Sequence, residues 1–285
     1  MKLAISSYSF YRFGQGVEAS RPSFAEMIER SAGYGVDGIE LLGDHFSRED
    51  MEPEALGPVK RLAMRQGVQI CAVSALHNFV NPDVAKRREQ IAIVERWIDV
   101  AAYMGAPVVR VWGGRWRTIT NFEEYMARGG HEPNLPGYTD DDAFAWSIES
   151  FHPCVEYAGR HGVTLGLENH WGLTGTAEGT LRIMHAVDSP WLKIILDTGN
   201  FLPDADVAAE LRLLAPHAVM VHAKTYLGGG LNYESRTDLA QSLVALRDAG
   251  YRGYLSLEFE GKAHPVDGIP AGLEELRGAM ATTGV

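Results

Sequence analysis

The segments LGLENH (165–170), IILDTGN (194–200), VMVHAK (219–224) and LSLEFEG (255–261) decide how this chain is interpreted. Each is an apolar run that predicts a buried strand, and each carries near its end a side chain able to bind a metal. These side chains are Glu168, Asp197, His222 and Glu258. Three carboxylates gathered in one buried place would repel one another, so a divalent cation is expected between them. Carboxylate oxygens and an imidazole nitrogen suit such an ion.

Strand-like segments alternate with helix-like segments along the whole chain. The helical pattern that starts at Phe24 has apolar residues at three- to four-residue spacing, and Ser23 with Glu26 forms a capping-box pattern before it. The expected strands are residues 3–10, 36–43, 68–76, 107–113, 163–170, 192–200, 218–226 and 253–261. Repeated strand–helix units without a change in composition predict an α/β fold, a (β/α)8 TIM barrel forming a single domain over residues 1–285.

The alternative architecture is an open, doubly wound sheet. That fold would need a phosphate-binding glycine loop after the first strand. The GQG at residues 14–16 is not such a loop. The barrel is therefore favoured.

One connection is much longer than the others. Residues 114–142, after the fourth expected strand, exceed the usual length of loops in compact domains. The segment contains Trp116, Phe122, Tyr125 and Tyr138, which is too aromatic for a disordered segment. It is expected to be either a lid over the barrel mouth or an arm that contacts a neighbouring subunit.

Composition limits the classes of partner. The net charge of −11 argues against a nucleic-acid partner, because phosphates must be neutralised by Lys and Arg. No apolar stretch is long enough to cross a membrane, and the N-terminal MKLAISSYSF indicates a first strand rather than a signal peptide. Cys71 and Cys154 lack metal-binding spacing, so a reduced, cytoplasmic protein is expected. Homo-oligomers are common among such barrels, so both a monomer and a homo-oligomer are compatible with the sequence.

The set LGLENH, IILDTGN, VHAK and LEFEG resembles the sugar phosphate isomerase/epimerase group of the xylose isomerase-like TIM barrels. That group includes ketose 3-epimerases, hydroxypyruvate isomerases and inosose dehydratases, with the apurinic-site endonucleases as distant relatives. The resemblance extends over essentially the whole chain. It implies that Glu168, Asp197, His222 and Glu258 bind one divalent metal ion (Mn, Mg, Co or Zn). It also implies that Glu168 and Glu258 are catalytic and exchange protons with the substrate.

The chemistry expected of such a site is proton removal next to a carbonyl. A cation that holds the carbonyl and hydroxyl oxygens of a sugar stabilises the enediolate. Two carboxylates on opposite sides of the sugar can then remove and return a proton. Lys224 is expected either to support the developing oxyanion or to form a salt bridge with Glu260. The side chains expected to bind a sugar or polyol substrate are His77, Trp112, His170, Asn200 and Lys224.

Two positions depart from the pattern of the relatives. The ketose epimerases carry a histidine where this chain has Asn200, and the multi-zinc endonucleases also need one where it has Trp112, so phosphodiester hydrolysis is not expected. Three functions remain. The favoured one is a metal-dependent isomerase or epimerase of a sugar or keto-polyol. The others are a dehydratase or lyase acting on a keto-inositol, dehydroshikimate or 3-keto-glycoside, and a non-catalytic sugar-binding barrel.

Overall fold

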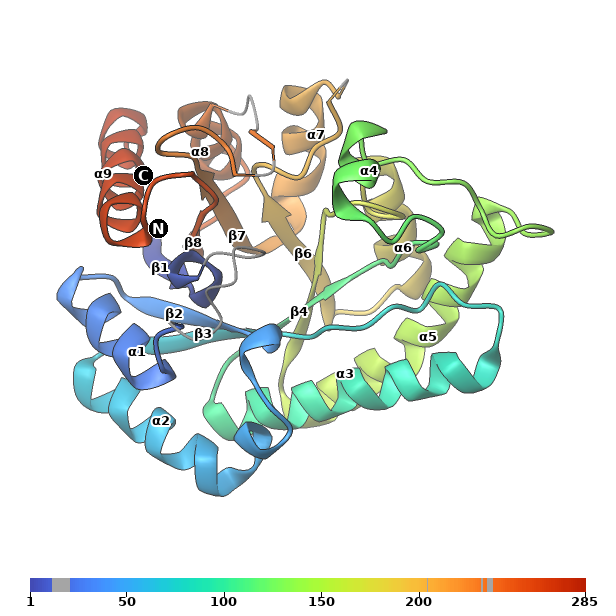
Figure 1. Ribbon diagram of the computed structural model, residues 1–285, viewed down its shortest axis with the longest axis horizontal. Helices are drawn as coiled ribbons and strands as arrows, with labels where there is room; N and C mark the ends of the chain where they lie inside the picture. The colour runs from blue at the N-terminus through green and yellow to red at the C-terminus, as the bar shows by residue number, and fades with distance from the viewer. Residues whose placement is uncertain (12–20, 204, 232, 235–237) are drawn as a thin grey trace.

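The computed structural model of the protein describes residues 1–11, 21–203, 205–231, 233–234 and 238–285. Its strands form a closed parallel barrel in which each strand pairs with the next along the chain and β8 pairs with β1 (Figure 1). The strands are β1 (Lys2–Ser6), β2 (Gly38–Leu42), β3 (Gln69–Ser74), β4 (Val108–Trp112), β5 (Thr164–Glu168), β6 (Leu192–Asp197), β7 (Ala218–Thr225) and β8 (Tyr254–Phe259). This confirms the predicted (β/α)8 barrel.

Each observed strand ends before its predicted last residue, because the chain leaves the sheet at the barrel mouth. The largest difference is in β1, where Ser7–Phe10 forms a 3-10 helix instead of continuing the strand. The GQG of residues 14–16 lies outside the described residues.

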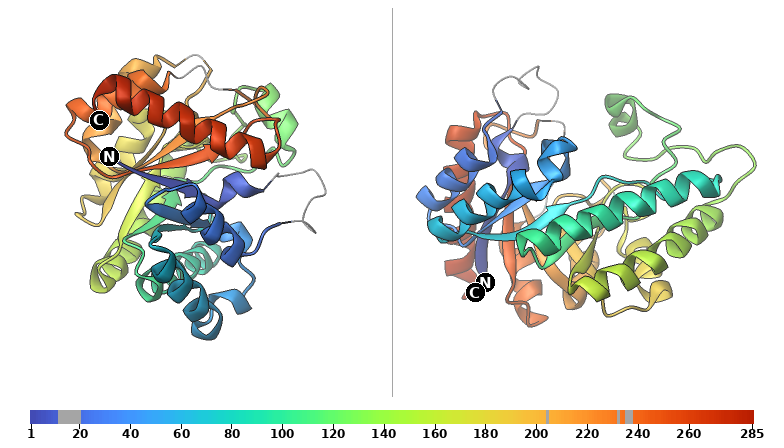
Figure 2. Two further views of the ribbon diagram at one scale, coloured as in Figure 1. Left: turned by 90° about the vertical axis from the view of Figure 1, so that its left-hand side faces the viewer. Right: turned by 90° about the horizontal axis from the view of Figure 1, so that it is seen from below.

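The helices surround the barrel, and the two ends of the chain lie close together (Figure 2). Ser23 accepts a hydrogen bond from the backbone of Glu26, whose carboxylate accepts one from the backbone of Ser23 at 2.7 Å, so the predicted capping box is present. The helices are α1 (Phe24–Gly33), α2 (Pro53–Gln66), α3 (Val84–Met104), α4 (Phe122–Ala127), α5 (Asp140–His161), α6 (Ala177–Val187), α7 (Val207–Leu214), α8 (Leu239–Asp248) and α9 (Pro265–Thr283). Within the described ranges, none of these helices combines the length and apolarity that a membrane span requires.

The inside of the barrel is layered, and this layering positions the site. A small apolar cluster inside the barrel contains Ala4, Ala72, Val108, Ile195 and Met220. Side chains two positions apart on a strand point the same way. The next inward-facing residues are therefore polar, and they are Ser6, Ser74, Arg110, Asp197 and His222. The apolar layer seals the lower end of the barrel, and the polar layer lies above it, toward the carboxyl ends of the strands.

Candidate metal centre and active site

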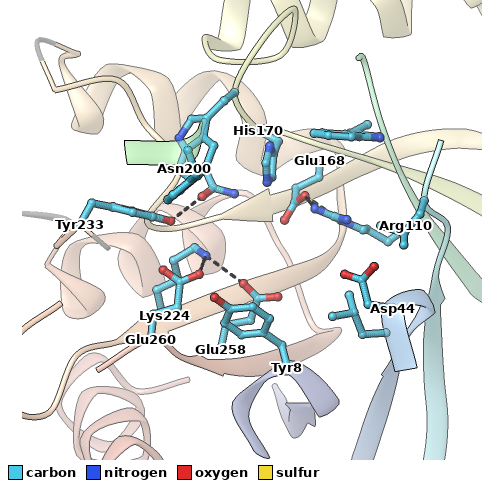
Figure 3. Close-up of a pocket in the computed structure, with 15 residues that line it drawn as sticks. Tyr8, Asp44, Arg110, Glu168, His170, Asn200, Lys224, Tyr233, Glu258 and Glu260 are labelled. Atoms are coloured by element: carbon cyan, nitrogen blue, oxygen red, sulfur yellow. Dashed lines mark hydrogen bonds and ion pairs between the residues drawn. The ribbon is translucent and has the colours of Figure 1, made fainter. Parts of the chain in front are cut away.

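A cavity of about 430 Å³ opens at the carboxyl end of the barrel. This volume lies within the range of small-molecule sites. Figure 3 shows its lining side chains converging from several strands and the loops that follow them. The lining residues are Tyr8, Leu42, Asp44, Leu76, Arg110, Trp112, Phe122, Glu168, His170, Trp171, Asn200, Lys224, Tyr233, Glu258 and Glu260.

The four predicted metal ligands meet at one point. One ligand atom from each of them lies within 4.8 Å of the others, and all four residues are buried. His222 Nδ1 lies 2.7 Å from Glu168 Oε1, 3.5 Å from Glu258 Oε1 and 3.8 Å from Asp197 Oδ2. The register of the sheet explains part of this convergence, since Asp197 on β6 pairs directly with His222 on β7. The sequence prediction that these side chains converge is therefore confirmed.

The charges in this cluster fit a divalent cation. Asp197 Oδ1 accepts hydrogen bonds from the backbones of Gly199 and Asn200 at 2.6 and 3.0 Å. Its Oδ2 is buried without a hydrogen-bond partner among the described residues, and burial raises the pKa of Asp197 to about 6. Burial alone would lower the pKa of His222, but the charges of Glu258 and Glu40 hold it well above its usual value. The carboxylates thus outnumber the imidazole in this cluster, and this excess of negative charge is what a divalent cation would neutralise.

Glu40 supports the imidazole from the opposite side of the barrel. Its Oε2 lies 3.0 Å from His222 Nε2 and 3.1 Å from the donating Oγ of Ser256. A carboxylate on the far nitrogen fixes the orientation of a metal-binding histidine, which leaves Nδ1 directed at the ligand cluster. Glu40 was not among the residues predicted from the sequence. The available signal was a single acidic residue inside the otherwise apolar run GIELL of β2.

Two cationic side chains flank the ligand cluster (Figure 3). Arg110 Nε donates to Glu168 Oε2 at 2.7 Å, and its Nη2 contacts the same oxygen. Burial would raise the pKa of Glu168, but the charges of Arg110 and His222 outweigh this effect and hold it well below its usual value. Glu168 Oε2 is thus occupied by the guanidinium, and Oε1 faces the candidate metal position.

Lys224 occupies the other flank. Its Nζ donates to Glu260 Oε1 at 2.6 Å and to Glu258 Oε2 at 3.0 Å, and lies 3.5 Å from Asp197 Oδ2. The salt bridge between Lys224 and Glu260, one of the two roles expected for this lysine, is therefore present. Gly199 permits the approach, because a Cβ there would collide with the Lys224 side chain.

The predicted substrate-binding residues fall into two groups. Trp112, His170, Asn200 and Lys224 all line the cavity. His77 does not line it. Its ring packs against Phe79 and Phe151 at centroid distances of 4.4 and 6.3 Å, and burial lowers its pKa to about 3. The backbone of His77 contacts one of the cavity residues, because its carbonyl oxygen accepts a hydrogen bond from Trp112 Nε1.

Further lining residues come from the segments that follow the strands, and they were not predicted from the sequence. Tyr8, Asp44 and Tyr233 follow β1, β2 and β7. Phe122 is the first residue of α4, within the long connection of residues 114–142, and its ring lies 5.1 Å from that of Trp171. The long connection thus reaches the cavity, which supports the lid interpretation.

Comparisons with known proteins agree with this geometry. The family model of the xylose isomerase-like TIM barrel matches residues 28–279, so the chain belongs to that family. No curated protein matches the sequence significantly.

Solved structures show the same fold at low sequence identity. A D-tagatose 3-epimerase-like protein superposes with a TM-score of 0.76 at 20% identity, covering 100% of this chain and 98% of the other. The 3-keto-D-glucoside 4-epimerase of E. coli gives 0.75 at 18% identity, with 98% and 99% covered. An L-ribulose 3-epimerase gives 0.75 at 19% identity, with 99% and 97% covered.

Proposed function

We propose that the protein is a metal-dependent isomerase or epimerase of a sugar or related keto-polyol. The observation that carries this proposal is the buried cluster of Glu168, Asp197, His222 and Glu258 at the bottom of a cavity of small-molecule size. The likeness in fold to several sugar epimerases supports it. One divalent ion, held by these four side chains, would polarise the substrate carbonyl and stabilise the enediolate charge.

Glu168 and Glu258 are proposed to move the proton. They enter the site from β5 and β8, on either side of His222. A sugar between these strands would present the carbon next to its carbonyl to one carboxylate and the opposite face to the other. The ion pairs with Arg110 and Lys224 keep both carboxylates in fixed orientations.

The polar side chains around them are proposed to orient the substrate. Asn200 offers an amide, Lys224 an ammonium group and His170 an imidazole at the wall of the cavity. Trp112 presents an indole ring against that of His170 at 5.0 Å, which gives a sugar ring an apolar face on which to lie.

Deuterium incorporation from heavy water tests this function. Protein loaded with Mn²⁺ is incubated with a panel of ketoses and keto-glycosides, and the recovered sugar is analysed by NMR. Metal-dependent deuterium next to the carbonyl is expected, and it should be lost in Glu168→Gln and Glu258→Gln. The matched control is Glu156→Gln, an exposed glutamate on α5, which should retain the activity.

The reaction products also distinguish an isomerase or epimerase from a lyase and from a non-catalytic sugar-binding barrel. Loss of water or of an aglycone would identify a lyase using the same proton abstraction. Binding without any metal-dependent change across the panel would contradict an enzymatic role and leave a sugar-binding barrel.

A further inference from the structure

The cavity has two chemically different ends. Its deep end is polar, and its cationic side chains Arg110 and Lys224 are held in ion pairs. Its outer end carries two apolar side chains that stay exposed although they line the cavity. These are Leu76, which is 40% exposed, and Phe122, which is 38% exposed. We call Leu76, Phe122 and Trp171 the apolar mouth.

The apolar mouth is held in place by the protein and does not depend on a bound molecule. Leu76 and Phe122 lie in the segments that follow β3 and β4, which are neighbours in the barrel. Asn78 joins these segments, because its Nδ2 donates to the carbonyl oxygen of Arg115 at 3.0 Å and its Oδ1 accepts from the backbone of the same residue at 3.0 Å. The packing of Phe122 on Trp171 extends this wall to the segment after β5.

A single polyol bound at the deep end would leave this wall uncovered. Polyol hydroxyls gain hydrogen bonds from carboxylates, amides and ammonium groups but gain little from leucine and phenylalanine side chains. Exposed apolar surface beside a binding site is typical of a surface that a ligand covers. The molecule that covers it must therefore extend outward from the deep end with an apolar group.

The charges of the cavity disfavour an anionic group on the outer part of the substrate. Both cationic side chains that line the cavity in the described part of the chain, Arg110 and Lys224, are already paired with carboxylates. Asp44 adds a carboxylate to the lining, and Figure 3 shows it on the same side of the cavity as Arg110. A phosphate or carboxylate on the outer part of the substrate would meet repulsion without a compensating cation.

We infer that the substrate is a keto-glycoside whose sugar occupies the deep end and whose neutral, apolar aglycone lies against Leu76 and Phe122. This inference rests on the proposed function, because it is the keto-sugar part that would reach the four ligands. It narrows the proposed function to substrates that combine a keto-sugar with an apolar aglycone, and it disfavours phosphorylated sugars.

The test compares benzyl and methyl 3-keto-β-D-glucopyranosides with Mn²⁺-loaded protein. The two compounds differ in apolar bulk and little in leaving-group ability. The readout is kcat/KM for metal-dependent deuterium incorporation or product formation. The benzyl compound should be preferred at least about tenfold, which requires burial of only about 60 Å² of apolar area. Phe122→Ala and Leu76→Ala should each lower this ratio toward one.

Leu213→Ala is the matched control, since Leu213 is a 52% exposed leucine on α7 that does not line the cavity. It should keep the benzyl-to-methyl ratio of the original protein. Equal kcat/KM for both compounds, or a ratio unaffected by Phe122→Ala and Leu76→Ala, would overturn the inference while leaving the proposed function intact. If neither compound nor any ketose reacts in a metal-dependent way, the proposed function fails and the inference fails with it.

Discussion

Tyr233 donates a hydrogen bond from its Oη to Oδ1 of Asn200 at 2.8 Å (Figure 3). This bond fixes the orientation of the amide, because the oxygen is directed at the phenol and Nδ2 remains as the group that can donate to a bound substrate. Lys224 Nζ lies 5.8 Å from the centre of the Tyr233 ring, so the same tyrosine also covers the ion-paired lysine. Tyr233 thus positions Asn200 at the wall of the cavity.

Removal of the Tyr233 hydroxyl should weaken catalysis through Asn200. We expect Tyr233→Phe to lower kcat/KM about tenfold, the loss that one misplaced hydrogen bond typically causes. A double-mutant cycle with Asn200→Ala should show that the two losses are not additive. Tyr103→Phe, which removes a surface hydroxyl bonded to the carbonyl of Pro53, is the control. Fully additive losses would show that the phenol acts independently of the amide.

The carboxylate of Glu40 should set the affinity of the metal site. Glu40→Gln removes the negative charge behind His222 Nε2, and we expect the dissociation constant for Mn²⁺ to rise 10- to 100-fold, as is usual for partners of metal-binding histidines. Calorimetric titration of the metal-free protein measures this. The exposed Glu156→Gln variant should bind Mn²⁺ normally, and an equal affinity in Glu40→Gln would contradict the role of Glu40.

Metal binding should stabilise the fold, because the four ligands come together only in the folded chain. At a free Mn²⁺ concentration of 100 times the dissociation constant, the free energy of unfolding should rise by about 2.7 kcal/mol. Asp197→Asn should abolish the rise, since Asp197 Oδ2 is the ligand atom left without a hydrogen bond. Differential scanning calorimetry with and without chelator shows the effect. The control is Asp141→Asn, a surface residue paired with Arg182, in which the full response should persist.

The buried His77 should make the protein sensitive to acid. Its pKa is about 3 in the folded protein, held down by burial and then by the charge of Arg110, against about 6.5 in an unfolded chain. Between these values the unfolded chain binds more protons, so stability falls as the pH drops from 6.5 toward 3. The contribution is up to about 1.4 kcal/mol per pH unit.

His77→Leu should therefore flatten the pH dependence of stability. Urea unfolding of the metal-free protein at pH 7, 5.5 and 4.5 measures it. Some acid sensitivity should remain, because burial also lowers the pKa of His45 to about 4 and that of His170 to about 3. His152→Gln, a change at an exposed position on α5, should leave the profile unaltered. If His77→Leu keeps the original pH dependence of stability, the imidazole of His77 is not the group that causes the acid sensitivity.

The barrel and the convergence of the four ligands could both be predicted from the amino-acid sequence. Both follow from local rules: apolar runs of strand length, helix starts such as Ser23–Glu26, and a side chain able to bind a metal near the end of each of the last four strands. Parallel strands bring their carboxyl ends to one side, so Glu168, Asp197, His222 and Glu258 had to meet once the strand order was known.

The side chains that those ligands contact could not be predicted in this way, because they come from distant parts of the folded chain. Glu40 reaches His222 across the barrel from 182 residues away in sequence. Tyr233 reaches Asn200 from a loop, and His77 packs between phenylalanines instead of lining the cavity. Such contacts depend on the stagger of the strands and the paths of the loops, which are set by packing between distant segments. Strand periodicity constrains the direction of a side chain, but the partner it meets is fixed only when the barrel closes.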